Sequence, residues 1–250
     1  MNLEEFFKEY KKVGICVSGG TDSAYLLCAA KQYGADIRAY YVKTQFQPKF
    51  ELEDARRVCA ELGIELTVLK EDVLADENIV TNPINRCYYC KKRLFSAIKA
   101  QAQKDGITTI ADGTNATDDA EDRPGMRAAK ELGVRSPLRE SGIGKQEIRE
   151  GLKAAGMWLW DKPSYACLAT RTEQGERIDR ETLQGIERAE TALAKIGLRD
   201  FRVRLIKGAA VLQVREEQMQ TVYESRNEIR EIMKQEFQRA LLDLEARKGE

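Results

Sequence analysis

A six-residue segment, Ser-Gly-Gly-Thr-Asp-Ser at positions 18–23, constrains the fold of this chain more than any other feature. It follows an apolar run over residues 13–17 and precedes a helical pattern over residues 22–33. Glycines allow a tight turn and a close approach to phosphate, and the amides at the start of a helix bind anions. A strand, this turn and a helix therefore predict an α/β fold that binds phosphate after its first strand.

The loop differs from the two common nucleotide motifs. No Gly-Lys-[Ser/Thr] follows it, as in a Walker loop, and the Gly-x-Gly-x-x-Gly pattern of dinucleotide-binding folds is absent. It resembles the PP-loop of the ATP pyrophosphatase superfamily, whose members split ATP into AMP and pyrophosphate. The resemblance implies that ATP is bound by Ser18, Gly19, Gly20, Thr21, Asp22 and Ser23. Asp22 would be repelled by phosphate unless it holds Mg²⁺ or orients the loop. A turn that only caps the helix is the alternative.

Strand and helix patterns alternate over the first 140 residues. Further strands are predicted over residues 37–42, 64–69 and 107–111, and helices over residues 50–62, 89–102 and 125–132. This spacing implies a parallel, doubly wound sheet. Ligands of such sheets bind at the carboxyl ends of the strands. We therefore expect Thr44 and Gly113, which follow two of these strands, to contribute to the ATP site.

A small α+β domain is predicted at the C-terminal end of the chain. Residues 156–175 have no clear period and read as an interdomain segment. Beyond it we predict a helix over residues 179–196, a hairpin of residues 201–206 and 209–214, and a final helix with the apolar stripe Ile229, Ile232, Met233, Phe237, Leu241 and Leu244. The predicted domains are residues 1–160 and 161–250.

Composition excludes several kinds of site. The 250 residues include no histidine, which rules out Ser-His-Asp triads, Cys-His pairs and His-ligated metals. Acidic and basic residues balance at 41 each, so a large sequence-independent contact with nucleic acid is not favoured. No apolar run approaches about 18 residues, and residues 1–12 resemble no signal peptide. We expect a cytoplasmic protein that binds neither membrane nor nucleic acid.

The chain has six cysteines: Cys16, Cys28, Cys59, Cys87, Cys90 and Cys167. The first three lie in predicted strands and helices, where we expect them to pack in the core. Cys87 and Cys90 form a C-x-x-C at the start of a helix, where the helix end and nearby cations favour thiolates. Such a pair is consistent with a redox couple, half a zinc site, part of an iron–sulfur site or two incidental thiols.

Cys167 lies in the predicted interdomain segment, between Lys162-Pro163 and Arg171. If this segment folds over the carboxyl ends of the strands, Cys167 lies beside the phosphate loop, and three thiolates converge. Without histidine, a four-ligand zinc site would need a carboxylate or another cysteine. Three cysteines suit a [4Fe–4S] cluster with one open iron, which could carry hydrosulfide.

Motifs over nearly the whole chain together resemble those of the LarE-type ATP-dependent sulfur transferases. They are the loop at 18–23, Asn82-Pro83, Arg86-Cys87, Cys90-Lys91, Asp112-Gly113-Thr114-Asn115, Asp122-Arg123-Pro124-Gly125, Ser136-Pro137-Leu138, Lys162-Pro163, Ala166-Cys167-Leu168 and Phe201-Arg202-Val203-Arg204. The resemblance implies a PP-loop domain of the adenine nucleotide alpha hydrolase-like fold, followed by a small C-terminal domain.

The resemblance also implies a reaction. A carboxylate of pyridinium-3,5-biscarboxylic acid mononucleotide is adenylated by ATP with Mg²⁺, and sulfur is then inserted to give a thiocarboxylate, in biosynthesis of the nickel-pincer cofactor of lactate racemase. Some family members give up the sulfur of the cysteine that matches Cys167. Others hold a [4Fe–4S] cluster on cysteines that match Cys87, Cys90 and Cys167. Because all three are present, we favour the cluster.

Two arginines and three aspartates complete the candidates. Arg202 and Arg204 lie on one side of a predicted strand, spaced to bind the phosphate of a mononucleotide or simply to face solvent. Asp118, Asp119 and Asp122 could assist a metal or face solvent. We expect a homo-oligomer with an unidentified sulfide donor. Thiolation of transfer RNA and a non-catalytic nucleotide sensor are the rival functions.

Overall fold

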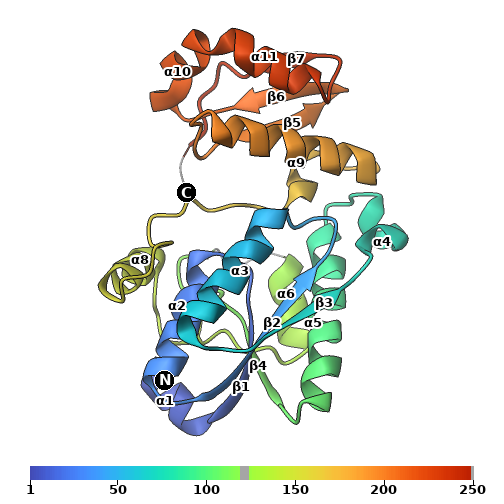
Figure 1. Ribbon diagram of the computed structural model, residues 1–250. Helices are drawn as coiled ribbons and strands as arrows, with labels where there is room; N and C mark the ends of the chain where they lie inside the picture. Colours follow the sequence, from blue (N-terminus) through green and yellow to red (C-terminus); the bar gives the residue numbers. More distant parts are fainter. Residues whose placement is uncertain (119–123, 249–250) are drawn as a thin grey trace. The chain divides into compact units, whose positions relative to one another are not determined.

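A computed structural model describes residues 1–118 and 124–248 of the chain (Figure 1). The described chain divides into two compact units. The first consists of Met1–Val73 and Asn85–Lys162, and the second of Leu74–Ile84 and the chain from Pro163 onward. We predicted a boundary between residues 160 and 161, whereas no sequence pattern assigned residues 74–84 to the second unit.

The first unit contains a four-stranded parallel sheet in the order β3-β2-β1-β4. Its strands are β1 (Lys12–Cys16), β2 (Asp36–Lys43), β3 (Leu66–Lys70) and β4 (Thr109–Ala111). This sheet confirms the predicted α/β, doubly wound parallel fold. The chain steps outward from β1 to β3 and then returns to the other side of β1 for β4. Ligands of open α/β sheets bind at such a switch point, outside the carboxyl ends of the strands.

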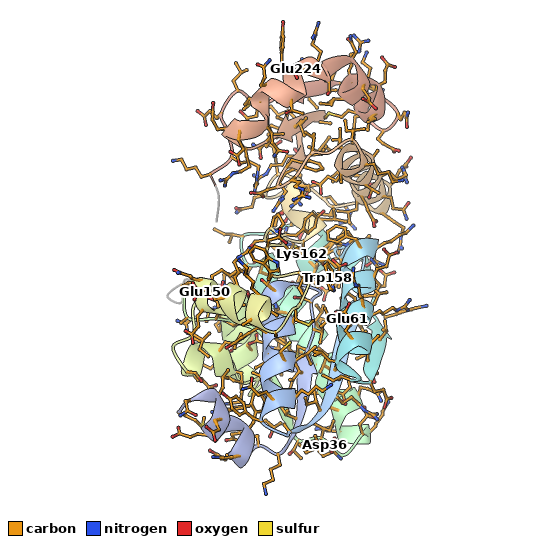
Figure 2. The ribbon with its side chains drawn as sticks, turned by 60° about the vertical axis from the view of Figure 1, so that its left-hand side comes forward. Asp36, Glu61, Glu150, Trp158, Lys162 and Glu224 are labelled. Carbon is orange, nitrogen blue, oxygen red and sulfur yellow. The ribbon has the colours of Figure 1, made fainter. Side chains whose placement is uncertain are left out.

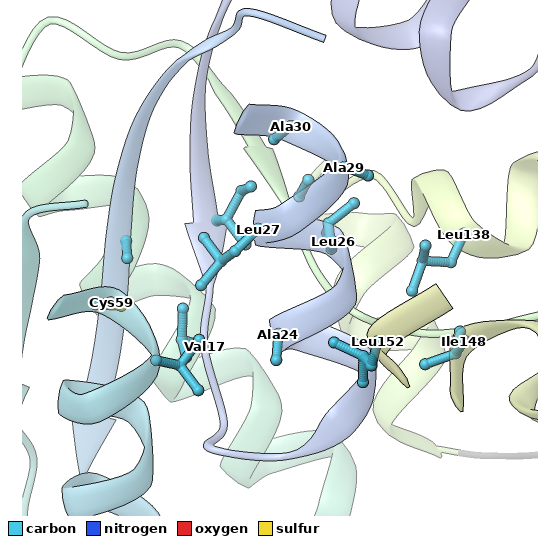
Figure 3. Packing of buried hydrophobic residues seen from close by; sticks show 14 of the residues in the cluster. Val17, Ala24, Leu26, Leu27, Ala29, Ala30, Cys59, Leu138, Ile148 and Leu152 are labelled. Atoms are coloured by element: carbon cyan, nitrogen blue, oxygen red, sulfur yellow. The ribbon is translucent and has the colours of Figure 1, made fainter. Parts of the chain in front are cut away.

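Helices cover both faces of this sheet (Figure 1). One face packs against α1 (Leu3–Glu9), α2 (Thr21–Gln32), α3 (Lys49–Leu62), α7 (Pro137–Glu140) and α8 (Lys145–Ala154), and the other against α5 (Arg86–Lys104) and α6 (Pro124–Glu131). Figure 3 shows Leu26 of α2 facing Leu138, with Leu152 of α8 close by. Each such buried aliphatic side chain contributes about 1.5–3 kcal/mol.

The predicted core cysteines pack as expected. Cys59 is buried in the cluster around α2, and the half-buried Cys28 packs against the same cluster. Cys16, also half-buried, packs against the cluster under α5. Burial raises the pKa of Cys59 and Cys28 to about 11, so both thiols stay protonated. These three cysteines are therefore packing residues.

The second unit has its own core between a small sheet and several of its helices. The sheet has the order β5-β6-β7, and the short helix α4 and three further helices complete the unit. The elements are α4 (Glu77–Val80), α9 (Arg180–Lys195), β5 (Arg202–Ile206), β6 (Ala209–Gln213), α10 (Met219–Glu224), α11 (Arg226–Lys234) and β7 (Ala240–Leu242). The predicted hairpin turn is confirmed, since Lys207 and Gly208 both have positive φ, 47° and 76°.

The predicted final helix is wrong beyond Lys234. Helix α11 ends there, and Leu241 lies in strand β7, which pairs in parallel with β6. Leu244, assigned to the apolar stripe, is 88% exposed. The backbone hydrogen bonds that the edge of β6 offers outweigh the helical pattern of this segment, a tertiary effect that local spacing does not report.

Residues 74–84 are fixed in the second unit by Asn82. This residue is buried with φ of 52°, and its side-chain amide donates to the carbonyl of Glu173 at 2.7 Å. Its own carbonyl accepts the amide of Gly175 at 2.8 Å. Arg177 and Glu77 add a two-fold ion pair with both distances 2.8 Å. The Asn82-Pro83 motif therefore fastens a segment that is distant along the chain.

Across the residues that the structure describes, no helix combines the length and the apolarity needed to cross a bilayer.

Candidate active site

Residues 18–23, here called the PP-loop, join β1 to α2 at the carboxyl edge of the sheet. Gly20 is the N-cap of α2 and has no side chain to cap the helix, so the first amides of α2 point outward from the loop. The Ser23 hydroxyl accepts the Ser18 amide at 3.2 Å and donates to the Gly20 carbonyl at 3.3 Å. These contacts preform a loop whose donors match an anion.

Two glycines are required where other backbone presses on the PP-loop. Gly19 has φ of 77°, and a Cβ there would lie 2.2 Å from the carbonyl oxygen of Glu51 in α3. A Cβ on Gly113 would lie 2.7 Å from the Ser23 amide. The structure thus brings Gly113 against the PP-loop, from the loop that follows β4, at the switch point of the sheet.

Asp22 lies between a cation and an amide. Its Oδ1 accepts from Lys145 Nζ at 2.7 Å, and its Oδ2 accepts from Asn115 Nδ2 at 3.1 Å. Lys145 also donates to the Thr21 hydroxyl at 2.9 Å. Lys145 was not among the predicted site residues, because α8 was not predicted. A single carboxylate beside a phosphate loop fits Mg²⁺, which is held by one or two carboxylates together with phosphates and water.

Thr44 and Asp118 close turns beside the site. The Thr44 hydroxyl donates to Gln47 Oε1 at 2.6 Å and accepts the Phe46 amide at 3.0 Å. The Asp118 carboxylate accepts the Asn115 amide at 3.0 Å. Both side chains shape their loops, and the ATP contact of Thr44 stays a prediction. Asp119 and Asp122 lie outside the described residues.

Lys162 reaches the PP-loop from the last residue of the first unit. Its Nζ donates to the Gly19 carbonyl at 2.7 Å and to the Asp54 carboxylate of α3 at 2.5 Å. Figure 2 shows Lys162 and Trp158 at the end of the first unit opposite Asp36, which begins β2. Lys162 is therefore at the carboxyl edge of the sheet, where the phosphate loop lies.

Cys87 and Cys90 are the second and fifth residues of α5, at the start of a helix as predicted. Cys87 is exposed and Cys90 is half-buried. The guanidinium of Arg86 lies 5.9 Å from the ring of Phe46, which follows β2, so that α5 begins at the carboxyl edge. A nitrogen of the same guanidinium lies 3.7 Å from Cys87 Sγ. The start of α5 therefore presents one exposed and one half-buried thiol, the former beside a guanidinium.

The three cysteines proposed for a cluster are divided between the units. Cys87 and Cys90 belong to the first unit and Cys167 to the second. Within either unit, over residues 1–118 and 124–248, no group of three or more Cys, Asp or Glu side chains is arranged to hold a metal ion. A three-cysteine ligand set therefore needs thiols from both units.

A buried ion pair holds the segment that carries Cys167. Arg171 is 1% exposed, and its Nε lies 2.7 Å from Glu190 Oε1 in α9. Burial acts to lower the pKa of Arg171, but the charge and hydrogen bonds of Glu190 outweigh it and raise that pKa. The guanidinium also donates to the carbonyl of Ala166 at 3.2 Å. Arg171 thus fixes the backbone next to Cys167.

Arg202 and Arg204 lie near two further arginines, Arg171 and Arg247. Arg202 is 4% exposed and donates to the Ser164 carbonyl at 2.6 Å, while Arg204 is exposed. Burial, then the charges of Arg171 and Arg247, lower the pKa of Arg202 to about 10. The same causes lower the pKa of Arg204. The burial of Arg202 argues against a merely solvated strand face.

Known proteins resemble this chain over most of its length. Residues 7–90 match the asparagine synthase family. An uncharacterized protein of Synechocystis sp. is 37% identical over 88% of this chain and 82% of its own length. One of Methanocaldococcus jannaschii is 32% identical over 98% of this chain and 93% of its own length.

A further relative carries a functional name. The pyridinium-3,5-bisthiocarboxylic acid mononucleotide synthase of Lactiplantibacillus plantarum is 28% identical over 84% of this chain and 76% of its own length. The parallel sheet, the PP-loop at its switch point and these relatives agree with one another. The chain belongs to the LarE-type ATP-dependent sulfur transferases of the PP-loop ATP pyrophosphatase superfamily.

Proposed function

We propose that this sulfur transferase converts a carboxylate of pyridinium-3,5-biscarboxylic acid mononucleotide into a thiocarboxylate, as a step in making a nickel-pincer cofactor. The observation that supports this proposal is the PP-loop, in which Asp22 contacts both Lys145 and Asn115. The substrate class comes from the relative named as a pyridinium-3,5-bisthiocarboxylic acid mononucleotide synthase.

In the first half-reaction the PP-loop binds the phosphates of ATP. An oxygen of the substrate carboxylate attacks the α-phosphorus, the bond between the α- and β-phosphates breaks, and pyrophosphate leaves. The amides at the start of α2 and the ammonium of Lys145 stabilise the charge that develops on pyrophosphate. Asp22 would hold Mg²⁺, which would neutralise charge on the phosphates, and Lys145, which contacts Asp22, would be a second cation beside them.

In the second half-reaction the acyl adenylate accepts sulfur. Hydrosulfide attacks the acyl carbon, the bond to AMP breaks, AMP leaves with the bonding electron pair, and the hydrosulfide proton passes to solvent. The products are a thiocarboxylate and AMP. Water at the acyl carbon would give back the carboxylate, so the sulfur nucleophile must be held where the adenylate forms.

The phosphate of the mononucleotide binds at Arg202 and Arg204. The guanidinium groups of Arg171 and Arg247 repel those of Arg202 and Arg204, and a bound phosphate dianion would relieve that repulsion. Arg247 supports this assignment, because its buried Nε has no hydrogen-bond partner among the described residues. Its neighbouring nitrogen lies 3.2 Å from Asp200.

A [4Fe–4S] cluster would be held by Cys87, Cys90 and Cys167, and when bound it would supply the sulfide. Cysteine thiolates are the protein ligands of such clusters. The motifs Arg86-Cys87, Cys90-Lys91 and Ala166-Cys167-Leu168, which resemble those of the LarE-type family, support this ligand set.

Pyrophosphate release tests the proposal. We expect release from ATP to need the pyridinium dicarboxylate mononucleotide, and the product to carry sulfur in place of one oxygen by mass spectrometry when sulfide is present. Nicotinamide mononucleotide, which has the ring and phosphate but no carboxylate, is the matched control and should give no release. Release that depends on transfer RNA, with thiolated uridine as product, would replace this function by RNA thiolation, and ATP binding without any release would leave a nucleotide sensor.

A further inference from the structure

Lys162 has the surroundings of a fixed structural element. Its side chain is 16% exposed, and that of its partner Asp54 is 22% exposed. The ring of Phe50, in the same helix as Asp54, lies 5.1 Å from Nζ. A lysine that is enclosed on several sides loses rotamer freedom, and its ammonium group then acts at one place.

The backbone of the same residue is also held. Arg149 of α8 donates to the carbonyl of Lys162 and to that of Trp160, both at 2.8 Å. The first residue of α8 is Lys145, which contacts Asp22 in the PP-loop. One helix therefore supports the PP-loop through Lys145 and the backbone of Lys162 through Arg149.

The ammonium group decides which way one peptide of the PP-loop faces. Nζ holds the carbonyl oxygen of Gly19 at 2.7 Å. In a trans peptide the C=O and the following N–H point in opposite directions, so the Gly20 N–H points away from Lys162. It points toward the Ser18 hydroxyl, 3.3 Å away, on the side of the loop that offers donors to an anion.

Without this contact, the hydrogen bond from the Gly20 N–H to the Ser18 hydroxyl, at 3.3 Å, is left to hold the peptide against rotation. Gly19 is already in the left-handed region, and glycine residues on both sides of one peptide offer little resistance to rotation of its plane. The rotated form would place a carbonyl oxygen where a phosphate oxygen has to bind. The two forms have opposite polarity toward ATP.

We propose that Lys162 is a positioning residue that keeps the Gly19–Gly20 peptide in its phosphate-binding orientation, with Asp54 holding the ammonium group in place. The inference rests on ATP binding at the PP-loop. It also connects the PP-loop to the segment that carries Cys167. Lys162 is followed directly by Pro163, and Cys167 is the fifth residue after Lys162. Whatever restrains Lys162 restrains the start of that segment.

The test is calorimetric titration of the whole protein with Mg²⁺ and α,β-methylene-ATP, which cannot be cleaved at the reacting bond. We expect Lys162→Ala to raise Kd about tenfold, the loss of a charged hydrogen bond, and Lys162→Arg to recover part of it. The control is Lys153→Ala, which removes an exposed lysine over the ring of Trp160 and should leave Kd unchanged. In turnover, Lys162→Ala should raise KM for ATP far more than it lowers kcat.

Two further readouts separate positioning from the alternatives. Asp54→Asn should weaken nucleotide binding if Asp54 steadies Lys162, whereas it should tighten binding if Lys162 contacts phosphate directly. Hydrogen exchange at the amides of residues 19–21 should be faster in Lys162→Ala at unchanged melting temperature. Unchanged Kd in Lys162→Ala, or tighter binding in Asp54→Asn, overturns the inference. Absence of binding by the wild-type protein would instead overturn the placement of ATP.

Discussion

Lys145 Nζ lies 2.7 Å from Asp22 Oδ1, which joins the start of α8 to the PP-loop although the two residues are 123 positions apart. Both side chains are less than one-third exposed. Because the pair is partly solvated, its effect on stability is about 1 kcal/mol or less. The pair places a cation beside the PP-loop.

Lys145→Ala is expected to slow pyrophosphate release about 100-fold, since one charged donor to the leaving group is lost. The melting temperature should change little. Single-turnover release of pyrophosphate, measured with saturating substrates, checks this. Gln146→Ala is the control, because Gln146 is the next residue of α8 and its side chain donates to Glu150 at the surface. Equal rates for Lys145→Ala and the wild type would remove Lys145 from the reaction.

Gly113→Ala is expected to abolish ATP binding, because the added methyl would meet the Ser23 amide at 2.7 Å and displace the PP-loop. Overpacking of this kind costs about 1–3 kcal/mol. Nucleotide titration and urea unfolding measure the two effects. Gly34→Ala provides the matched control, since Gly34 has φ of 74° with nothing within 4 Å of the added atom. It should lower stability by about 1 kcal/mol through backbone strain and leave ATP affinity intact.

Changing Cys87, Cys90 or Cys167 to Ala should each remove the iron from protein purified without oxygen, which we expect to contain about four irons per chain. The measurements are the iron content of the protein and the absorbance of the sulfur-to-iron charge-transfer bands. Cys59→Ala, which alters a buried core thiol, should retain the iron. If the wild type holds no iron and Cys167 alone becomes dehydroalanine on turnover, the cysteine itself is the sulfur source.

The ion pair between Glu140 and Arg135 predicts that the free energy of unfolding falls in acid. The hydrogen bond from Arg135 holds the pKa of Glu140 below its ordinary value of 4.5. A carboxyl whose folded-state pKa is lowered stabilises the protein above its unfolded pKa, and the contribution is lost as the pH falls through the folded pKa. Glu140→Gln should therefore be less stable than the wild type by about 1 kcal/mol at neutral pH. In urea unfolding the difference should shrink as the pH falls below 4.5 and through the lower folded-state pKa of Glu140; a constant difference would contradict the ion pair.

The strand, loop and helix around the PP-loop could be predicted because their pattern is local. The apolar run, the glycines and the first turn of α2 are contiguous, and the residue types of each predict its local conformation. The same holds for the cap of α3, where Gly63 has φ of 66°. Local chemistry was sufficient to place the phosphate loop at the end of β1.

Lys145 could not be found in this way. Lys145 reaches Asp22 because α8 packs closely on α2, where a Cβ on Gly151 would lie 2.3 Å from the ring of Tyr25. No spacing in the sequence reports that approach. Leu241 shows the opposite error. The apolar spacing around it predicts a helix, but the segment pairs with the edge of β6 as a strand. Lys162 was recognised as part of a motif, and its partner Asp54 was not.

The interleaving of the two units governs how this protein can be divided. The chain changes unit at Val73–Leu74, at Ile84–Asn85 and at Lys162–Pro163. A fragment cut after Lys162 would carry residues 74–84 without Glu173 and Gly175, the hydrogen-bond partners of Asn82. The complementary fragment would lack residues 74–84, which belong to its own unit. Dissection into separately expressed halves thus requires grafting, with residues 74–84 moved by circular permutation or supplied as a peptide.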